Sequence, residues 1–190
     1  EVGQDTVILP GTMLQGKTKV GKNCTLGPDT QLTDVICGDG NHLNRVYAHS
    51  CELGDNNEIG PFVHLRPETC LHNDIKIGNF VEVKNSDVDD GTKLPHLIYC
   101  GDSDLGKNVN FGCGTVTVNF DGKNKHRCTI DEHAFIGCNT NLVAPVHIGA
   151  RAFTAAGSTI TKDVPAKALA VGRAKQVNIE NWVKEDTYKD

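Results

Sequence analysis

Apolar side chains recur every six residues along most of the chain. The repeat has three long runs, which are Leu14, Val20, Leu26 and Leu32, then Leu53, Ile59, Leu65, Leu71, Ile77 and Val83, and finally Ile130, Ile136, Leu142, Ile148, Thr154 and Ile160. A period of six matches neither an amphipathic helix, with its period of about 3.6 residues, nor a series of hairpins. It is typical of a hexapeptide parallel β-helix, in which each hexad forms one short side and three hexads close a triangular coil. The pattern therefore predicts an all-β triangular prism.

Stacking explains why such a repeat folds. A single coil cannot bury its apolar residues, but coils stacked about 4.8 Å apart join those residues into a continuous internal ladder. The sides are short, so the chain needs many tight corners, and Gly, Asn and Asp tolerate the positive φ angles that corners require. The composition agrees with this picture, because 20 of the 190 residues are glycine and only 5% are aromatic.

Two steps of the repeat are shorter than six residues. Val88 follows Val83 by five residues, and Leu105 follows Cys100 by five. We expect complete coils with shortened sides in this part of the chain. The period is lost over residues 33–46, which we predict to be irregular.

The repeat breaks again after Thr117. The step from Thr117 to Ile130 is one residue longer than two hexads. We therefore expect one added residue near this point and a protruding loop that turns at Asp121–Gly122 and carries Asn119 and Lys125 outward.

The hexapeptide pattern ends near Pro165. Residues 1–165 are predicted to form the β-helix domain. Residues 166–190 are predicted to form a tail, partly helical near Trp182, that packs on the outside of the prism. Because the chain starts inside a repeat, we expect it to be a fragment that lacks N-terminal sequence.

The charge balance excludes some classes of partner. A net charge of −5 disfavours a general binder of nucleic acid or of anionic membranes, because such proteins need a basic face. A local basic cluster can still bind one phosphate group. No apolar run approaches the roughly 20 residues that span a bilayer, and no signal peptide opens the chain.

The eight cysteines show no CxxC pair or other zinc-ribbon spacing. Cys24, Cys51 and Cys128 each stand two residues before an apolar residue of the repeat, where a small side chain packs inward. We interpret the cysteines as reduced structural thiols, with disulfides or metal ligands as the less favoured alternative. Reduced thiols are usual in cytosolic proteins, so we expect a cytoplasmic location.

Several segments resemble one known family. They are IGNFVEVKNS, LPHLIYCGD, LGKNVNFGCGTVTVNFDGKNKHR, LVAPVHIG and AAGSTITKDVP, and the similarity runs from about Glu58 to Asn178. The family is the acetyltransferase domain of the bacterial bifunctional glucosamine-1-phosphate acetyltransferase and N-acetylglucosamine-1-phosphate uridyltransferase. The N-terminal uridyltransferase domain of that family, with its Mg²⁺ ligands, has no counterpart in this sequence.

The resemblance implies a fold, a reaction and an assembly. The fold is a left-handed parallel β-helix, and the assembly is a homotrimer with its sites between subunits. The reaction transfers acetyl from acetyl-CoA to the amine of glucosamine-1-phosphate. The product, N-acetylglucosamine-1-phosphate, serves the synthesis of UDP-N-acetylglucosamine and peptidoglycan. No metal is expected in this domain.

His96 stands at the position of the family's catalytic histidine. Acetyl transfer to an amine needs a neutral nitrogen, and an imidazole can take the amine proton as the nitrogen attacks the thioester carbonyl. The resemblance therefore implies that His96 is the general base of a direct transfer in a ternary complex, without a Cys or Ser nucleophile.

The resemblance also implies two sets of binding residues. The residues for the sugar phosphate are Arg66, Lys84, Tyr99, Asn110 and Lys125. The residues for acetyl-CoA are Cys113, Asn119, Phe120, Cys138, Ala156 and Arg173. Cationic side chains suit a phosphate because they form charge-assisted hydrogen bonds. The spacing adds an independent prediction, because the step from Arg66 to Lys84 equals three hexads, one regular coil, so the two side chains should stack.

Three of the acetyl-CoA positions differ from the family's usual residues. Cys113 replaces alanine, Phe120 replaces tyrosine and Cys138 replaces serine. A thiol is a weaker hydrogen-bond donor than a hydroxyl, and phenylalanine has no donor. Two alternatives therefore stay open, an acetyltransferase with another acceptor and a non-catalytic trimeric scaffold. A γ-type carbonic anhydrase would need a cluster of three histidine ligands, and the histidine spacing shows no such triad.

Overall fold

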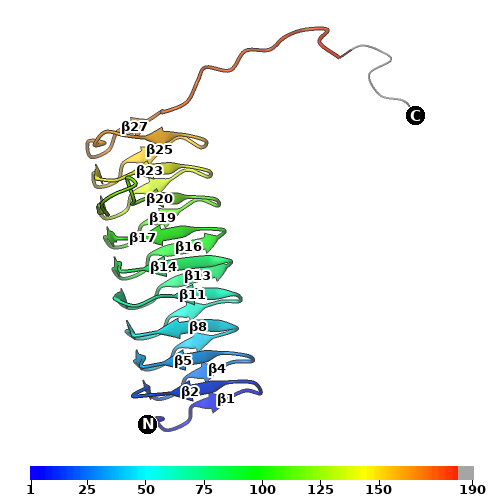
Figure 1. Ribbon diagram of the computed structural model, residues 1–190, viewed down its shortest axis with the longest axis vertical. Helices are drawn as coiled ribbons and strands as arrows, with labels where there is room; N and C mark the ends of the chain where they lie inside the picture. The colour runs from blue at the N-terminus through cyan, green and yellow to red at the C-terminus, as the bar shows by residue number, and fades with distance from the viewer. Residues whose placement is uncertain (184–190) are drawn as a thin grey trace.

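The computed structural model describes residues 1–183 as a tall prism of stacked coils with a tail at its C-terminal end (Figure 1). Each coil passes in turn through three parallel sheets of ten, nine and eight strands, and these residues contain no helix. The structure confirms the predicted left-handed parallel β-helix. Residues 1–183 accordingly contain no helix of the length and apolar character needed to cross a membrane.

The strands are two to four residues long. The first sheet consists of β1 (Val7–Ile8), β4 (Thr25–Leu26), β7 (His42–Leu43), β10 (Glu58–Ile59), β13 (Lys76–Asn79), β16 (Lys93–His96), β19 (Asn110–Phe111), β22 (Phe135–Ile136), β25 (Phe153–Thr154) and β27 (Leu169–Ala170). The second sheet consists of β2 (Met13–Gln15), β5 (Gln31–Thr33), β8 (Val46–His49), β11 (Val63–Leu65), β14 (Val81–Lys84), β17 (Tyr99–Gly101), β20 (Val116–Val118), β23 (Asn141–Val143) and β26 (Thr159–Ile160). The third sheet consists of β3 (Lys19–Val20), β6 (Ile36–Cys37), β9 (Cys51–Leu53), β12 (Thr69–Leu71), β15 (Asp87–Val88), β18 (Ser103–Leu105), β21 (Cys128–Ile130) and β24 (Val146–Ile148).

The residues of the hexapeptide repeat form the core. Their side chains stack inside the prism from coil to coil, and Leu26, Leu65 and Ile136 have no exposed surface. Small polar side chains also point inward near the corners, where Thr92, for example, donates a hydrogen bond of 2.8 Å to the carbonyl oxygen of Gly106. Every buried side-chain nitrogen and oxygen in the described residues has a hydrogen-bond partner. The polar core groups therefore carry no desolvation penalty from unpaired donors or acceptors.

The cysteines predicted to lie in the core do so. Cys24, Cys51 and Cys128 are buried and, like the other cysteines, have free thiols. Burial raises the pKa of the Cys51 thiol to about 11 and that of Cys128 to about 12. These two thiols are therefore protonated and unreactive at neutral pH.

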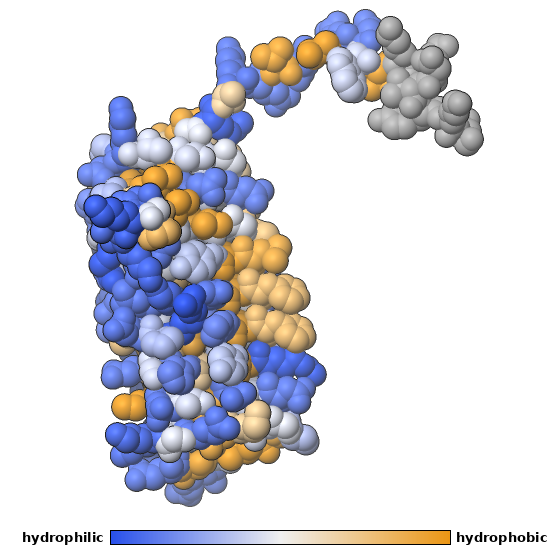
Figure 2. All heavy atoms as spheres, in the orientation of Figure 1, coloured by the Kyte–Doolittle hydropathy of each residue, from blue (hydrophilic) through white to orange (hydrophobic). Residues whose placement is uncertain are grey.

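The corner between the first and second sheets carries an apolar ridge, formed by Phe62, Phe80 and Leu97. These residues have φ angles of 60°, 57° and 52°, which cost bulky side chains about 1–2 kcal/mol each. Their side chains are nevertheless 54–58% exposed, and the rings of Phe62 and Phe80 stack with centroids 5.4 Å apart. Figure 2 shows the ridge as an orange column on one edge of the prism.

The prediction that residues 33–46 are irregular is wrong. The coils continue through this stretch as β6, β7 and β8. Cys37, Leu43 and Ala48 fill the inward positions. The hexad pattern is hidden for two reasons. Cysteine and alanine replace the usual branched residues, and the coil from Thr25 to its partner His42 is one residue shorter than a regular coil of three hexads.

The shortened coils after Val83 are confirmed, but the size of the insertion after Thr117 is not. The coil from Ser103 to its partner Cys128 is longer than a regular coil of three hexads by seven residues. Thr117 and Ile130 lie on consecutive sides of one coil, where a step of one hexad is normal. The prediction of one added residue assumed two hexads between Thr117 and Ile130. Because only one hexad lies between them, the insertion is larger.

The tail begins later than predicted. β27, within the predicted tail, pairs with β25 and continues the first sheet. Gly172 still exchanges hydrogen bonds with Ser158 and Thr159 at the end of the prism. Residues 174–183 then lead away from the prism and do not pack along its outside (Figure 1). The predicted helix near Trp182 is not present through residue 183, and residues 184–190 lie outside the described part of the chain.

Candidate active site

Four predicted residues form a column on the corner between the first and second sheets. Asn79 on β13 pairs with His96 on β16, and Lys93 on β16 pairs with Asn110 on β19. Since His96 follows Lys93 by three residues and Cys113 follows Asn110 by three, the same register places Cys113 beside His96. The amide of Gly114 donates to the carbonyl of His96 at 3.3 Å, which supports this register.

The next two coils extend the same column. The amide of Asn139 donates to the carbonyl of Cys113 at 2.7 Å, and the amide of Gly157 donates to the carbonyl of Cys138 at 2.8 Å. His96, Cys113, Cys138 and Ala156 therefore lie one above another, and we call them the corner column.

Close backbone contact holds the corner column together. A Cβ atom on Gly137 would lie 2.5 Å from the carbonyl oxygen of Thr154 and 2.6 Å from the nitrogen of Ala156. Only glycine therefore fits at this position without a shift of the neighbouring coil. At the top of the column, the Cδ atom of Arg173 lies 3.8 Å from the place that a Cβ on Gly157 would take. The structure thus brings Arg173 next to the column.

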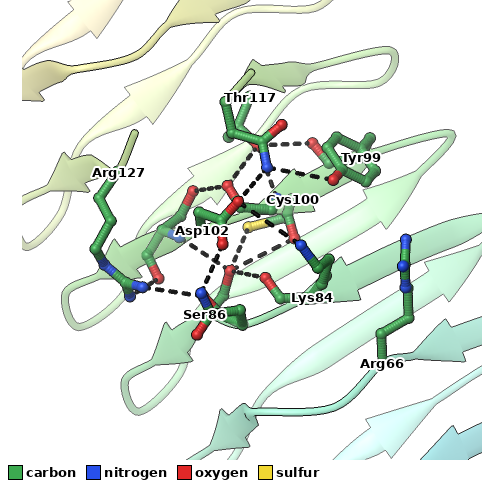
Figure 3. A network of polar contacts seen from close by, with 12 residues as sticks. Arg66, Lys84, Ser86, Tyr99, Cys100, Asp102, Thr117 and Arg127 are labelled. Atoms are coloured by element: carbon green, nitrogen blue, oxygen red, sulfur yellow. Dashed lines mark hydrogen bonds and ion pairs between the residues drawn. The ribbon is translucent and has the colours of Figure 1, made fainter. Parts of the chain in front are cut away.

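The opposite corner, between the second and third sheets, carries the basic residues. The Nζ atom of Lys84 lies 3.9 Å from Oδ2 of Asp102, and both side chains are largely buried. Arg66 lies one coil toward the N-terminus, as its spacing predicted, and forms an ion pair of 2.8 Å with Glu82. Figure 3 shows Lys84, Tyr99 and Asp102 converging there.

The electrostatics of this group favour an anion. The ammonium group of Lys125 lowers the pKa of Lys84, as do burial and the charge of Arg66, and only Asp102 opposes the shift. Two ammonium groups are thus held together in spite of their repulsion. We call Arg66, Lys84 and Lys125 the phosphate cluster.

The inserted loop, residues 119–127, closes over this corner. Phe120 and Lys125 form a short antiparallel bridge. Asp121 holds the turn between them by accepting hydrogen bonds from the amides of Asn124 (2.6 Å) and Lys123 (2.7 Å) and by pairing with His126 (2.8 Å). These contacts lower the pKa of Asp121 to about 2. The predicted loop and its turn are confirmed.

Asn119 does not project outward with the loop. Its side chain is only 8% exposed and donates hydrogen bonds to Oδ2 of Asp102 and to the Tyr99 hydroxyl, the latter at 3.4 Å. The prediction that the loop carries Asn119 outward is therefore wrong. The side chain turns inward because Asp102 is a buried carboxylate that needs donors. Asn119 lies among the residues of the basic corner and not in the corner column, and Phe120 is exposed on the loop.

Two residues of this corner were missed by the sequence prediction. Asp102 accepts hydrogen bonds from Asn85 (2.6 Å) and Asn119. Arg127 pairs with Asp104 and donates to the carbonyls of Asn85 (3.1 Å) and Ser103, which anchors the end of the loop. Both residues stand inside segments that resemble the family, Asp102 at the end of LPHLIYCGD and Arg127 at the end of LGKNVNFGCGTVTVNFDGKNKHR. That resemblance is the signal that could have identified them.

Within one chain the two corners do not meet. His96 precedes one corner of a coil, and Asp102, with a φ of 49°, forms the next corner. Tyr99 on β17 lies between them and lines a groove of about 920 Å³ along the outer face of the second sheet. Asn110 is on the first sheet, beside Lys93. The predicted residues thus form two groups separated by one side of the prism.

Replacing Asp102 with asparagine should destabilise the protein by about 2–4 kcal/mol, because charge-assisted hydrogen bonds to Asn85 and Asn119 are lost. Burial alone would raise the pKa of Asp102, but those hydrogen bonds and the charges of Lys84 and Lys125 outweigh burial and lower it. The carboxylate therefore stabilises the fold above the unfolded pKa of about 3.9, and this contribution is lost as the pH falls through the folded value.

Urea unfolding at pH 7 and at lower pH measures this effect. The difference between wild type and Asp102→Asn should shrink as the solution becomes acidic. Asp34→Asn is the matched control, because Asp34 is an exposed corner residue that accepts one backbone hydrogen bond of 2.8 Å, and an amide oxygen can replace it. A difference for Asp102→Asn that does not change with pH would contradict the role of its charge.

The chain is similar to known proteins over nearly its whole length. No family model matches the chain. The chain is 53% identical to the bifunctional protein GlmU of Geobacillus sp. (strain WCH70) over 182 residues, and 56% identical to that of Caldanaerobacter subterraneus subsp. tengcongensis over 185 residues. These alignments cover 96% and 97% of the chain but 40% of each relative, so the chain spans two fifths of their length.

A solved structure supports the fold. The UDP-N-acetylglucosamine acyltransferase of Francisella novicida superposes with a TM-score of 0.52 at 16% identity, over 88% of this chain and 63% of that chain. At this low identity the superposition shows the architecture alone. Sequence identities of 53% and 56% over nearly all its residues place the chain in the GlmU family, where it corresponds to the C-terminal part of these bifunctional proteins.

Proposed function

We propose that this domain transfers the acetyl group of acetyl-CoA to the amine of glucosamine-1-phosphate, yielding N-acetylglucosamine-1-phosphate for UDP-N-acetylglucosamine and peptidoglycan synthesis in the cytoplasm. The observation that carries the proposal is the arrangement of two groups on one rigid frame. A histidine heads the corner column, and the phosphate cluster occupies the next corner. Membership in the GlmU family supports the choice of donor and acceptor.

The phosphate cluster suits the acceptor. A phosphate dianion beside Lys84 and Lys125 would relieve the repulsion that lowers the pKa of Lys84. Arg66, one coil away, can add a bidentate contact. The Tyr99 hydroxyl, in contact with Asn119, is available to bind the sugar, and Asn110 is proposed to reach it from another chain.

The corner column suits the donor. Its backbones pack closely around Gly137, which leaves a flat edge along Cys113, Cys138 and Ala156 for an extended pantetheine arm. Arg173 beside the column is proposed to meet a CoA phosphate. The thiols at Cys113 and Cys138 need no covalent role in this scheme.

The proposed chemistry needs one proton acceptor and no acyl-enzyme. The lone pair of the acceptor amine attacks the thioester carbonyl carbon, and the imidazole of His96 takes a proton from the nitrogen as the C–N bond forms. The C–S bond then breaks, the CoA thiolate leaves, and the imidazolium of His96 gives its proton to that sulfur, which restores the neutral base and yields free CoA. The N-acetylated sugar phosphate is the second product.

A complete site needs more than one chain, because His96 and the phosphate cluster lie on different corners of the prism. The apolar ridge adjoins His96, since Leu97 belongs to the ridge and follows His96 directly. An exposed apolar surface of this kind favours contact with another protein surface. Three-fold packing around the ridge would bring the corner column of one chain toward the groove of the next, so we propose a homotrimer with sites between chains.

A thiol-release assay tests the proposed function. Acetyl-CoA and glucosamine-1-phosphate should release free CoA thiol in a reaction that depends on both substrates. Glucosamine without the phosphate should react at a kcat/KM lower by about 10–100-fold, the loss of one or two charge-assisted hydrogen bonds. A reaction without acceptor corrects for the thiols of the protein.

Two outcomes would favour the alternatives. An intact trimer that releases no thiol at millimolar substrate would be a scaffold. Faster acetylation of a different amino sugar or amino acid would change the acceptor and keep the reaction class.

A further inference from the structure

The outer face of the third sheet carries a second group of reactive side chains, on a different side of the prism from the corner column. The register places Glu52, Cys70 and Asp87 opposite one another on β9, β12 and β15. His72 follows Cys70 by two residues, so its side chain lies on the same face. The sulfur of Cys70, a ring nitrogen of His72 and a carboxylate oxygen of Asp87 all lie within 4.8 Å of one another.

These separations suit a tetrahedral metal ion. With bonds of about 2.0–2.3 Å to sulfur, nitrogen and oxygen, zinc holds its ligand atoms about 3.3–3.7 Å apart. Nε2 of His72 and Oδ1 of Asp87 are 2.9 Å apart, and the two side chains are 42% and 57% exposed. Small rotations of exposed side chains therefore suffice to bring the three atoms to a common centre, and one position of the tetrahedron stays open to water.

The charges around this group also favour a cation. A thiolate and a carboxylate neutralise a divalent ion, and Glu52 and Asp89 add negative charge nearby. Among the described residues, neither Glu52 nor Asp89 has a Lys or Arg partner, whereas Asp90 pairs with Lys107 at 2.9 Å. Burial, together with the charges of Asp87 and Glu52, raises the pKa of the Cys70 thiol. A bound metal reverses that effect because it takes the place of the thiol proton.

We propose that Cys70, His72 and Asp87 bind a zinc ion, with water as the fourth ligand, and that this ion links β12 to β15. A donor set of one sulfur, one imidazole and one carboxylate selects zinc over magnesium and calcium, which prefer all-oxygen sites. His72 also lies near Asp89 and Asp90, but that set lacks a thiol, and the sulfur decides the preferred metal.

Zinc titration of the chelator-treated full chain tests the proposal. Competition with a chromophoric chelator should give one zinc per chain, and zinc should raise the midpoint of thermal unfolding. Cobalt, used as a spectroscopic substitute, should show a thiolate-to-metal charge-transfer band in the near ultraviolet. Cys70→Ser should abolish that band. Cys70→Ser and His72→Ala should each weaken zinc binding at least about 100-fold, since loss of even an outer-shell partner costs 10–100-fold.

Two matched controls keep the result specific. His147→Ala removes a histidine on the same sheet that pairs with Asp131 at 2.9 Å but has no cysteine in its group, so zinc binding should persist. Cys138→Ser removes an exposed thiol elsewhere and should also leave binding unchanged. Absence of binding at micromolar zinc, or equal binding by wild type, Cys70→Ser and His72→Ala, would overturn the proposal. Loss of binding in Asp89→Asn, together with retention in Cys70→Ser, would replace the proposed ligand set with the carboxylate pair.

Discussion

Replacing His96 with alanine is expected to lower the rate of acetyl transfer by about 10²–10⁴-fold, the range for loss of a general base. His96 is exposed at the head of the corner column, and its backbone is held by Asn79 on one side and Gly114 on the other. The side chain therefore makes little contribution to packing, and the variant should unfold at the wild-type urea concentration. Steady-state thiol release and urea unfolding measure the two quantities.

Chemical rescue distinguishes a general base from a residue that only supports the structure. Added imidazole should restore part of the activity of His96→Ala, because a small base can enter the space that the side chain leaves. His42→Ala is the matched control, since His42 is an exposed histidine of the same first sheet on β7, and its rate should stay within about twofold of wild type. Near-normal turnover of His96→Ala would remove His96 from this role.

Replacing Phe80 with glutamate is expected to convert the proposed trimer into monomers and to lower activity at least about 100-fold. Phe80 is the middle residue of the apolar ridge, 58% exposed and stacked on Phe62. In a trimer packed around the ridge, three carboxylates would be buried close together without partners, at a cost of several kcal/mol. The monomer itself should stay folded, because the side chain is on the outside of the prism.

Light scattering after size exclusion measures the assembly, and the thiol-release assay measures activity on the same samples. Ile36→Glu is the matched control, because Ile36 is an equally exposed apolar residue, at 54%, on the third sheet away from the ridge. That variant should remain trimeric. A trimeric Phe80→Glu would exclude the ridge as the interface, and a fully active monomer would show that one chain holds a complete site.

Most of the fold could be predicted from the pattern of residues. The period of six reports which side chains point inward, and Leu65 or Ile136 is buried because every coil has the same need for an apolar interior. The prediction failed where that need is met by smaller residues, as at Cys37 and Ala48, and where residues leave the coil. The size of the loop after Thr117 depends on which sides the flanking residues occupy, and spacing alone does not reveal that.

The sequence predicted only part of the geometry of the candidate site. The stacking of Arg66 and Lys84 follows from one regular coil and is confirmed by the register. The alignment of His96, Cys113 and Ala156 in a single column, in contrast, depends on register offsets that differ from each pair of coils to the next. Those offsets become visible only when the shortened sides and the insertion have been placed in three dimensions.

The β-helix, the inward set of residues and the family follow from the sequence alone, because they depend on local periodicity and on motifs that are contiguous in the chain. The folded chain was needed to show that Asn119 turns inward to Asp102, that Lys125 returns to Lys84 from a later coil, and that Cys70, His72 and Asp87 meet. Contacts between coils depend on register, and each shortened side or inserted residue changes which side chains face one another.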